Sequence, residues 1–341
     1  MGPAPSSLIE LEEQLSRPTP RVTEALTSLR GDLLLLGVGG KMGLSLARMA
    51  RRALDVAGSP ARVIGVSRFS QGQRAVFEEV GVETVVADLL EPRQVTNLPE
   101  AGAVIVMAGR KFGSTGDLPL TWAMNAWLPA TICQRFPARP CVVFSTGNVY
   151  GLCPLASGGS TEEDEPRPVG EYAQSCLARE RMYQYFSPRL EIPLAIVRLN
   201  YACDLRYGVL VDLAQRVWRG EPVPLEMGWF NTIWQREANE RTLLCLSRLT
   251  IPPQIVNVTG NETVSVRWAC DEFARRWNRT VRYLGKEQET ALLSSSARAD
   301  AWWGPPEVSA PTLLDWVARW REAGGVELGK PTHFESRTGD F

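Results

Sequence analysis

The stretch "DLLLLGVGGKMGLSLARMARRAL", residues 32–54, decides the fold of this chain. It begins as a short run of leucines, continues through glycines, and then places apolar residues at helical spacing. Gly37, Gly40 and Gly43 recur at every third position across the junction. Glycine permits a tight turn there, a close approach of the backbone to a pyrophosphate, and close packing of helix on strand. We predict a buried strand, a dinucleotide-binding turn and a crossover helix, the alternative being a purely structural turn.

Strand-like and helix-like segments continue to alternate along the next part of the chain. Alternation of this kind is typical of a parallel sheet wound on both sides through right-handed crossovers. We therefore predict the α/β class, with a Rossmann-type doubly wound sheet. The expected strands are 61–67, 82–89, 102–109, 140–146 and 193–200, and the expected helices are 73–81, 118–136 and 172–186.

Changes in the hydrophobic pattern and in composition divide the chain into four parts. Residues 1–30 carry two short helical patterns and form a helical N-terminal extension, and residues 31–200 form the dinucleotide-binding domain. Residues 201–330 are irregular and form mostly a smaller α/β substrate lobe, with about 236–260 returning to the sheet. We expect residues 331–341 to form a tail.

Composition excludes several classes of function. A formal net charge of -1 gives no sign of a nucleic-acid partner, and no apolar run approaches the roughly 18 residues of a membrane span. The seven cysteines include no CxxC pair, so we expect neither disulfides nor a metal site, and a cytoplasmic location. The single histidine, His333, excludes Ser-His-Asp, Cys-His and multi-histidine metal centres.

The end of the second expected strand bears on the choice of cofactor. An NAD-preferring site would offer Asp or Glu to the ribose hydroxyls there, whereas this chain has Ser67 and Arg68. A hydroxyl and a guanidinium suit a 2'-phosphate, so we expect NADP(H) in preference to NAD(H). The alternative is that Arg68 is a solvated loop residue.

At "VVFSTGNVYG", residues 142–151, and "YAQSCLARE", residues 172–180, the sequence resembles the extended short-chain dehydrogenases of the NAD-dependent epimerase/dehydratase family. The resemblance covers roughly residues 31–320. It implies that Tyr172 is the acid-base residue, with Thr146 as the catalytic hydroxyl, and that a homodimer forms through the helices bearing Asn125 and Tyr172. The cofactor-binding residues that it implies are Gly37, Gly40, Lys41, Met42, Gly43, Ser67, Arg68, Asp88, Leu89, Ala108, Gly109, Asn125 and Tyr172. We place Asn148, Arg198 and Gln235 near the substrate.

Cys176 departs from the family pattern, because the family has lysine four residues after the tyrosine. That lysine binds the nicotinamide ribose and lowers the pKa of the tyrosine, and Lys41 and Lys111 are the nearest cations in sequence that could replace it. Three roles for Cys176 stay open: a buried packing residue, a catalytic thiol, or the mark of lost activity. Without a cation, Tyr172 is weakened more as a base than as an acid.

These observations predict an NADP(H)-dependent oxidoreductase or epimerase. It would act on a carbonyl or hydroxyl of a sugar-like or other polar small molecule, with Tyr172 as proton donor or acceptor. Two alternatives remain: a catalytically silent NADP-binding regulatory module, and a redox-neutral lyase or isomerase that holds its cofactor tightly.

Overall fold

The computed structural model describes residues 3–339 except 71, 112 and 115. Its centre is a seven-stranded sheet in the order β12-β7-β5-β4-β1-β2-β3, and every pair of neighbouring strands in it is parallel. The predicted Rossmann-type fold is confirmed. The strands are β1 (Leu33–Leu36), β2 (Val63–Ser67), β3 (Glu83–Val86), β4 (Ala103–Val106), β5 (Cys141–Thr146), β7 (Leu194–Leu199) and β12 (Gln254–Val258).

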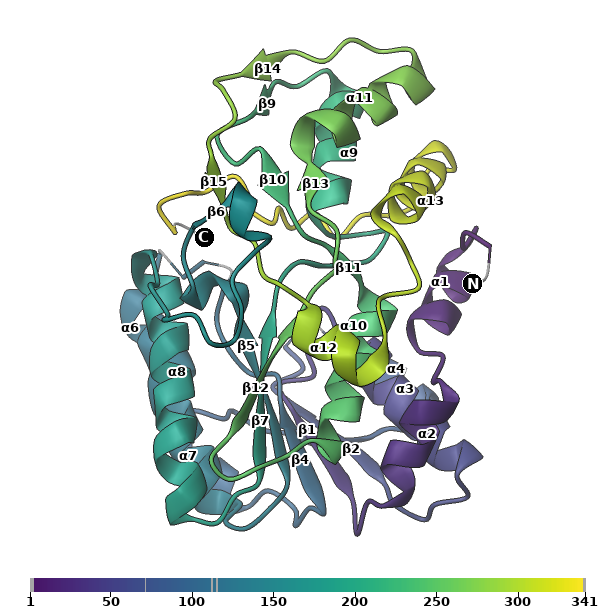
Figure 1. Cartoon of the computed structure of the whole chain (residues 1–341). Coiled ribbons are helices and arrows are strands. Elements are labelled where there is room, and N and C mark those ends of the chain that lie inside the picture. The colour runs from purple at the N-terminus through teal and green to yellow at the C-terminus, as the bar shows by residue number, and fades with distance from the viewer. Residues whose placement is uncertain (1–2, 71, 112, 115, 340–341) are drawn as a thin grey trace.

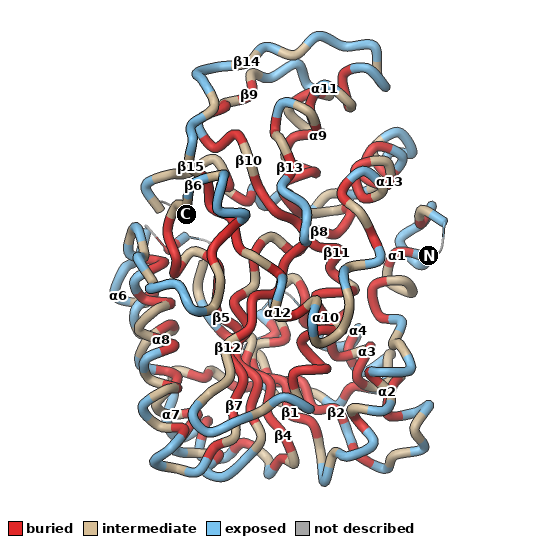
Figure 2. Tube along the Cα trace, viewed as in Figure 1, coloured by how far each residue is buried: buried red, intermediate tan, exposed pale blue. Residues whose placement is uncertain are grey.

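Helices cover both faces of this sheet (Figure 1). One face packs against α2 (Pro20–Thr27), α3 (Gly43–Val56), α10 (Gln235–Leu244) and α12 (Ala297–Trp303). The other face packs against α5 (Pro92–Thr96), α7 (Leu128–Arg135) and α8 (Gly170–Arg189), while α4 (Arg74–Glu79) lies beside β3. The inner strands are buried along most of their length because both faces are covered, whereas β3 at the edge has no buried residue (Figure 2).

The strand order reverses between β1 and β4, because β1 pairs with β2 on one side and with β4 on the other. In open α/β sheets a ligand binds at this reversal, beyond the carboxyl ends of the strands. The glycine turn follows β1 directly. The fold therefore places the turn at the position where a ligand is expected.

The single helix expected over 118–136 is interrupted. The structure has α6 (Leu118–Trp122), a π-helical turn (Ala123–Trp127) and then α7. The N–H of Leu128 bonds the carbonyl of Ala123, and Pro129 has no N–H to continue a regular ladder. The widened turn carries Asn125, which is buried. The predicted helix therefore forms over 118–135, but it contains a π-helical turn that the sequence reasoning did not expect because it ignored Pro129.

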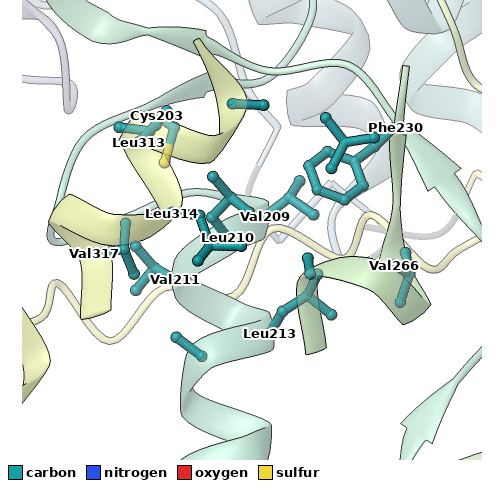
Figure 3. Close-up of a cluster of buried hydrophobic side chains, with 14 of the residues drawn as sticks. Cys203, Val209, Leu210, Val211, Leu213, Phe230, Val266, Leu313, Leu314 and Val317 are labelled. Atoms are coloured by element: carbon teal, nitrogen blue, oxygen red, sulfur yellow. The ribbon is translucent and has the colours of Figure 1, made fainter. Parts of the chain in front are cut away.

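The smaller lobe lies above the carboxyl ends of the strands (Figure 1). It packs α9 (Val209–Arg219), α11 (Val266–Trp277) and α13 (Ala310–Glu322) around an apolar core. Figure 3 shows Leu210 of α9 beside Leu314 of α13, with Phe230 on the other side. Short strands complete it: β6 (Cys153–Pro154), β8 (Ala202–Cys203), β9 (Val223–Pro224), β10 (Trp229–Phe230), β11 (Ile233–Trp234), β13 (Val264–Ser265), β14 (Tyr283–Leu284) and β15 (Thr290–Ala291).

The N-terminal extension joins the two parts of the molecule. Leu11 and Leu15 of α1 (Leu8–Leu15) belong to the core of the smaller lobe, whereas Val22 and Leu26 of α2 pack on the sheet. Ser7 caps α1 and Thr19 caps α2 with their side-chain oxygens. The extension is therefore part of the folded core.

The end of the chain is not a free tail where the structure describes it. Phe334 is 1% exposed within the core of the smaller lobe, and Thr332 donates its backbone N–H to the Asp212 carboxylate at 2.8 Å. Arg337 donates to the backbone carbonyl of Thr290 at 2.8 Å. The segment expected to form a tail is held in place by these three contacts where the structure describes it.

Among the described residues, none of the helices is both long enough and apolar enough to cross a membrane.

Candidate functional site

Two cavities, each of about 230 Å³, meet at the glycine turn. Gly37, Gly40 and Met107 line both of them. The first, which we call the lobe cavity, lies between the sheet and the smaller lobe and is also lined by Lys41, Met42, Lys111, Phe144, Ser145, Thr146, Asn148, Tyr172, Leu199, Asn200, Tyr201, Ala202, Tyr207, Gly208 and Thr332. The second, the edge cavity, is also lined by Gly39, Ser67, Arg68, Phe69, Ser70, Gln73, Ala87, Asp88, Leu89, Ala108, Gly109 and Met124.

The glycine turn has the geometry that a dinucleotide requires. Gly37 has φ +88°, and a Cβ there would lie 2.6 Å from the backbone nitrogen of Ala108. A Cβ on Gly43 would lie 1.9 Å from the carbonyl oxygen of Val38, so Gly43 packs α3 against the turn and faces neither cavity. A Cβ on Gly40 would make an ordinary 3.7 Å contact with the carbonyl oxygen of Gly37, and Gly40 lines both cavities just before the N-terminus of α3, the end of a helix that favours a phosphate.

The edge cavity gathers the residues expected around the adenosine half of a cofactor. Arg68 is exposed, and its guanidinium lies 3.8 Å from the Asp88 carboxylate. Asp88 also accepts the backbone N–H of Leu90 at 2.9 Å, which fixes the carboxylate at the end of β3. The hydroxyl of Ser67 packs against Gly39. Leu89, Ala108 and Gly109 complete the walls of this cavity.

Tyr172 and Thr146 lie together in the lobe cavity. Tyr172 is in the first turn of α8, and its hydroxyl is hydrogen-bonded to the side chains of Thr146 and Cys176. Thr146 ends β5 and caps the 3-10 turn Gly147–Val149, where its Oγ1 accepts the backbone N–H of Asn148 at 3.2 Å. Helix α8 and strand β5 therefore bring the two hydroxyls, 26 residues apart in sequence, to one point.

The surroundings of Tyr172 keep its phenol protonated. Burial raises the pKa of Tyr172 well above its ordinary value, and the hydrogen bond to Cys176 adds to the rise. The positive charge of Arg179 and the hydrogen bond to Thr146 lower the pKa but do not offset the burial. At neutral pH the side chain is a proton donor.

Cys176 is fully buried behind Tyr172. Its sulfur lies 3.9 Å from the side-chain nitrogen of Asn125, and it packs with Val149 and Tyr150. Burial raises the pKa of the Cys176 thiol, so the thiolate that a nucleophile needs is disfavoured. Among the described residues, no group of three or more His, Cys, Asp or Glu side chains could hold a metal ion.

Arg179 is the cation that acts on Tyr172, and the sequence reasoning missed it. Its guanidinium donates to the carbonyl oxygen of Phe144 at 3.0 Å and to the side-chain oxygen of Asn125. Arg179 follows Tyr172 by two helical turns in α8, so the two residues share a helix face. This spacing in the sequence could have indicated that Arg179 lies near Tyr172. Asn125, expected at the cofactor, instead holds Arg179 from behind the cavities and accepts the backbone N–H of Arg110 at 2.9 Å.

Of the three residues expected at the substrate, only Asn148 lines the lobe cavity. Arg198 is 2% exposed in β7, pairs with the buried carboxylate of Glu180 at 2.6 Å, and lies over the ring of Tyr150. Gln235 is fully buried and donates to Ser45 of α3 at 3.0 Å. The structure brings neither Arg198 nor Gln235 to a cavity, because each is used to join elements of the core.

Comparison with known families gives one match that spans half of the chain. The sequence model described as the NAD dependent epimerase/dehydratase family matches residues 33–203. This range runs from β1 to β8 and includes the glycine turn, Thr146 and Tyr172. No curated protein matches the sequence.

Solved structures with the same fold are numerous and distant in sequence. MoeE5 in complex with UDP-glucose and NAD is 19% identical, with a TM-score of 0.68 over 86% of this chain and 99% of that one. UDP-glucose 4-epimerase from Thermotoga maritima is 14% identical, with a TM-score of 0.69 over the same two shares. DesIV, a dTDP-glucose 4,6-dehydratase from Streptomyces venezuelae, is 19% identical, with a TM-score of 0.69 over 85% and 97%.

Proposed function

Since this chain belongs to the NAD dependent epimerase/dehydratase family, we propose that it reduces the carbonyl group of a small polar molecule, with Tyr172 as the proton donor. The family is one of nicotinamide-dependent oxidoreductases and epimerases, and this chain is an enzyme of that kind. The observation that carries the proposal is the pair of Tyr172 and Thr146, hydrogen-bonded to each other in a cavity that adjoins the glycine turn.

The residues of the chain fit a nicotinamide dinucleotide across the two cavities. The glycine turn would bind the pyrophosphate, the edge cavity the adenosine, and the lobe cavity the nicotinamide beside Tyr172. When bound, the reduced cofactor supplies a hydride. Gly37, Gly40, Met42 and the turn of Ala108 and Gly109 would hold it in place.

Tyr172 completes the reduction by giving its proton to the carbonyl oxygen as negative charge develops there. The hydroxyl of Thr146, which donates to Asn148 Oδ1 at 3.0 Å in the structure, would turn to donate a hydrogen bond to the same oxygen and so orient the carbonyl. The raised pKa of Tyr172 suits this direction, because the phenol holds its proton until the alkoxide forms. Alcohol oxidation needs the phenolate instead, and the fully buried thiol of Cys176 offers no charge that stabilises it.

The substrate class follows from the fold family and from the walls of the lobe cavity. Two of the similar structures carry UDP-glucose, which supports a sugar-like substrate for this chain as well. Asn148 and Asn200 line the cavity and provide amide groups for the hydroxyls of such a molecule.

We propose a preference for NADP(H) over NAD(H). Support comes from Arg68, whose exposed guanidinium lies at the mouth of the edge cavity beside Ser67. In Arg68→Ala we expect the Kd of NADPH to rise about tenfold, because a charge-assisted hydrogen bond to the 2'-phosphate is lost. The Kd of NADH, measured in the same titration, is the internal control. An equal change in both would contradict the preference.

We also propose a homodimer in a cytoplasmic setting. Leu118, Trp122, Trp127 and Tyr185 are exposed apolar residues on α6, the π turn and α8, the helices through which the family resemblance implies dimerisation. The scattered cysteines, which include no CxxC pair in the sequence, support a reducing compartment. In light scattering, Trp127→Arg should shift the protein towards the monomer.

Loss of the Tyr172 hydroxyl tests the proposed function. A panel of aldehydes and ketones is screened with NADPH and NADH by the loss of cofactor absorbance. Tyr172→Phe should then lose about 10²–10⁴-fold in kcat while its affinity for cofactor is unchanged. Tyr185→Phe, which removes an exposed hydroxyl from the same helix, is the matched control. Unchanged turnover in Tyr172→Phe would rule out the role of this residue.

A further inference from the structure

Tyr201 lines the lobe cavity from the corner where the chain leaves β7 and enters the smaller lobe. Its backbone has φ +48°, in the left-handed region that a bulky residue rarely adopts. Residues held in such conformations cluster at ligand sites, where the strain is part of how a side chain is placed. The position and the conformation of Tyr201 therefore both indicate a role in the cavity.

The contacts around this corner hold the strained backbone in place. The carbonyl of Tyr201 accepts the hydroxyl of Thr232 at 3.0 Å and the backbone N–H of Ile233 at 3.2 Å. The preceding residue, Asn200, donates its backbone N–H to the carbonyl of Val258 at 3.0 Å. Strand β8 begins at the next residue and pairs with β11. The backbone of Tyr201 is therefore held from the sheet on one side and from the smaller lobe on the other.

The hydroxyl of Tyr201 is the part of the side chain that remains available. In the part of the chain that the structure describes, this hydroxyl has no hydrogen-bond partner, and its oxygen is not sealed inside the core. The ammonium of Lys111 lies over the ring, 5.8 Å from its centre, and a contact with the face of a ring leaves the hydroxyl unused. Burial raises the pKa of Tyr201 above its ordinary value, so the group keeps its proton and acts as a donor.

Two other hydroxyls that line the lobe cavity are already bonded to carboxylates of the protein. Ser145 donates to Glu180 at 2.5 Å, and Thr332 donates to Asp212 at 2.6 Å. Such groups help to build the wall and are committed before a ligand arrives. The Tyr201 hydroxyl is different, because a ligand that excludes water from the cavity must supply its acceptor or leave it unsatisfied.

The order of the sheet separates Tyr201 from the glycine turn. Strand β5, which ends in Thr146, lies between β7, which precedes Tyr201, and the strands β4 and β1. The glycine turn follows β1, so the proposed cofactor would reach Thr146 and Tyr172 from that side. The β7 side of the reacting groups is then left for the substrate.

We propose that Tyr201 determines specificity by donating a hydrogen bond to a second oxygen of the substrate, a hydroxyl or ring oxygen in addition to the carbonyl that Tyr172 protonates. The inference rests on the proposed function, because it takes the lobe cavity as the place of reaction. It narrows the substrate to carbonyl compounds with at least one further oxygen. A site that hydrogen-bonds such a group rejects an analogue that lacks it.

Matched ring ketones test this contact on the full chain. Tetrahydropyran-3-one and tetrahydropyran-4-one have the ring of cyclohexanone with a methylene group replaced by an ether oxygen, which accepts a hydrogen bond and donates none. The Kd of each ketone is measured by ligand-observed NMR on protein saturated with NADP⁺ or NAD⁺, whichever binds more tightly, because the oxidised cofactor cannot reduce them. Tyr201→Phe keeps the ring and loses only the hydroxyl. Tyr185→Phe, at a position 50% exposed, is the matched control.

We expect the affinity of at least one ether, relative to cyclohexanone, to fall about fivefold in Tyr201→Phe and to stay at the wild-type value in Tyr185→Phe. The ratio cancels any change that affects both rings alike, and the ether that responds shows where the second oxygen lies. Tyr201→Phe should unfold at the same temperature as the wild type, because the hydroxyl has no described partner to lose.

Three results would overturn the role of Tyr201. They are an unchanged ratio for both ethers, no binding of any of the ring ketones to the wild type, and a weaker Kd of the cofactor in Tyr201→Phe with both ratios unchanged. The last result would assign the hydroxyl to the cofactor.

Failure of this contact and failure of the proposed function are distinguishable, because binding of the ring ketones requires no turnover. A lower ratio in Tyr201→Phe, without product from any carbonyl compound supplied with NADPH or NADH, would remove the proposed reduction but leave the contact. Reduction that depends on Tyr172, with both ratios unchanged in Tyr201→Phe, would do the reverse.

Discussion

At the scale of single residues, Cys176 stands where the family resemblance implies a lysine, and under the proposed function this favours carbonyl reduction over alcohol oxidation. A lysine at position 176 would place its charge beside the phenol. The cation that acts on Tyr172 is instead Arg179, which lies three residues after position 176 in α8 and is held by Asn125. The positive charge of Arg179 lowers the pKa of Tyr172, but by less than burial raises it. The residues around Tyr172 therefore favour a neutral acid.

Removal of the Arg179 charge should weaken alcohol oxidation more than carbonyl reduction. In Arg179→Met the pKa of Tyr172 rises further, and the already scarce phenolate becomes scarcer. We expect the ratio of oxidation to reduction to fall about tenfold, as measured by kcat in the two directions. Arg181→Met, an exposed position on the same helix, serves as control. An unchanged ratio would show that Arg179 has only a structural role.

Tyr172 and Thr146 could be selected as candidate residues from the sequence, but the side chains that surround them could not be predicted. The family resemblance selected them, and the structure places both in the lobe cavity, whereas the electrostatic effect of Arg179 depends on how α8 packs against β5 and the π turn. Arg198 was expected near the substrate because its strand resembles an arginine-containing strand of the family, and Gln235 because its segment was expected near the mouth of the cleft. Each instead has a partner inside the core that no local pattern reveals.

At the scale of elements, one buried ion pair joins α8 to β7 beneath the site. Glu180 is fully buried, accepts from Arg198 at 2.6 Å, and also accepts the hydroxyl of Ser145 at 2.5 Å. Glu180→Gln keeps the shape but leaves the Arg198 cation without its countercharge. Urea unfolding should show a loss of about 3–5 kcal/mol.

The double variant Glu180→Leu with Arg198→Met is the control for this pair. It removes both charges, so it should be more stable than Glu180→Gln. A loss below about 1 kcal/mol in Glu180→Gln would mean that water or another group reaches Arg198.

A second carboxylate, Glu237 in α10, should make stability depend on pH. Burial raises its pKa from 4.5 to about 7, although it accepts the backbone N–H of Val308 at 3.4 Å. Between about pH 4.5 and about pH 7, the folded protein keeps the proton of the Glu237 carboxyl, whereas the unfolded chain has already released it. The free energy of unfolding should therefore fall as the pH rises through this window.

Glu237→Gln keeps an acceptor and has no proton to lose. Its stability, measured by urea unfolding from pH 4 to 8, should lack the part of the decline that Glu237 causes in the wild type. Glu221→Gln, at an exposed position, should leave the decline as it is. Identical pH profiles in Glu237→Gln and wild type would contradict the raised pKa.

The strands were the elements best predicted from the sequence, and the helix around Asn125 was the least well predicted. Buried parallel strands are short apolar runs between turn residues, and β12 was correctly expected to return to the sheet. The π turn needed Pro129 to be weighed against an otherwise regular helical pattern. The two-residue strands of the smaller lobe depend on tertiary pairing and have no periodicity to detect.

At the scale of the whole molecule, the C-terminal segment connects the smaller lobe to the site. Phe334 packs 6.0 Å from Phe230, centre to centre, and Thr332 two residues earlier lines the lobe cavity. No motif in the sequence indicated this connection, because contacts between distant segments follow no local pattern. The cavity is complete only when this segment is in place.

Truncation of the Phe334 ring should loosen the segment and destabilise the protein. Phe334→Ala removes a fully buried aromatic side chain, and urea unfolding should show a loss of about 3–5 kcal/mol. Faster hydrogen exchange in residues 328–339 should accompany it. Leu328→Ala, at a position 38% exposed, should cost much less. Equal losses in the two variants would contradict the packing role of Phe334.

The central claim is that this chain moves a hydride to a carbonyl while Tyr172 supplies the proton. The most direct measurement is mass spectrometry of products after incubation of the carbonyl panel with NADPH or NADH deuterated at the reactive carbon. We predict deuterium on the carbinol carbon with the wild type and Tyr185→Phe, and at least about a hundredfold less with Tyr172→Phe. Bound cofactor without label in any product, or equal label with Tyr172→Phe, would contradict the account.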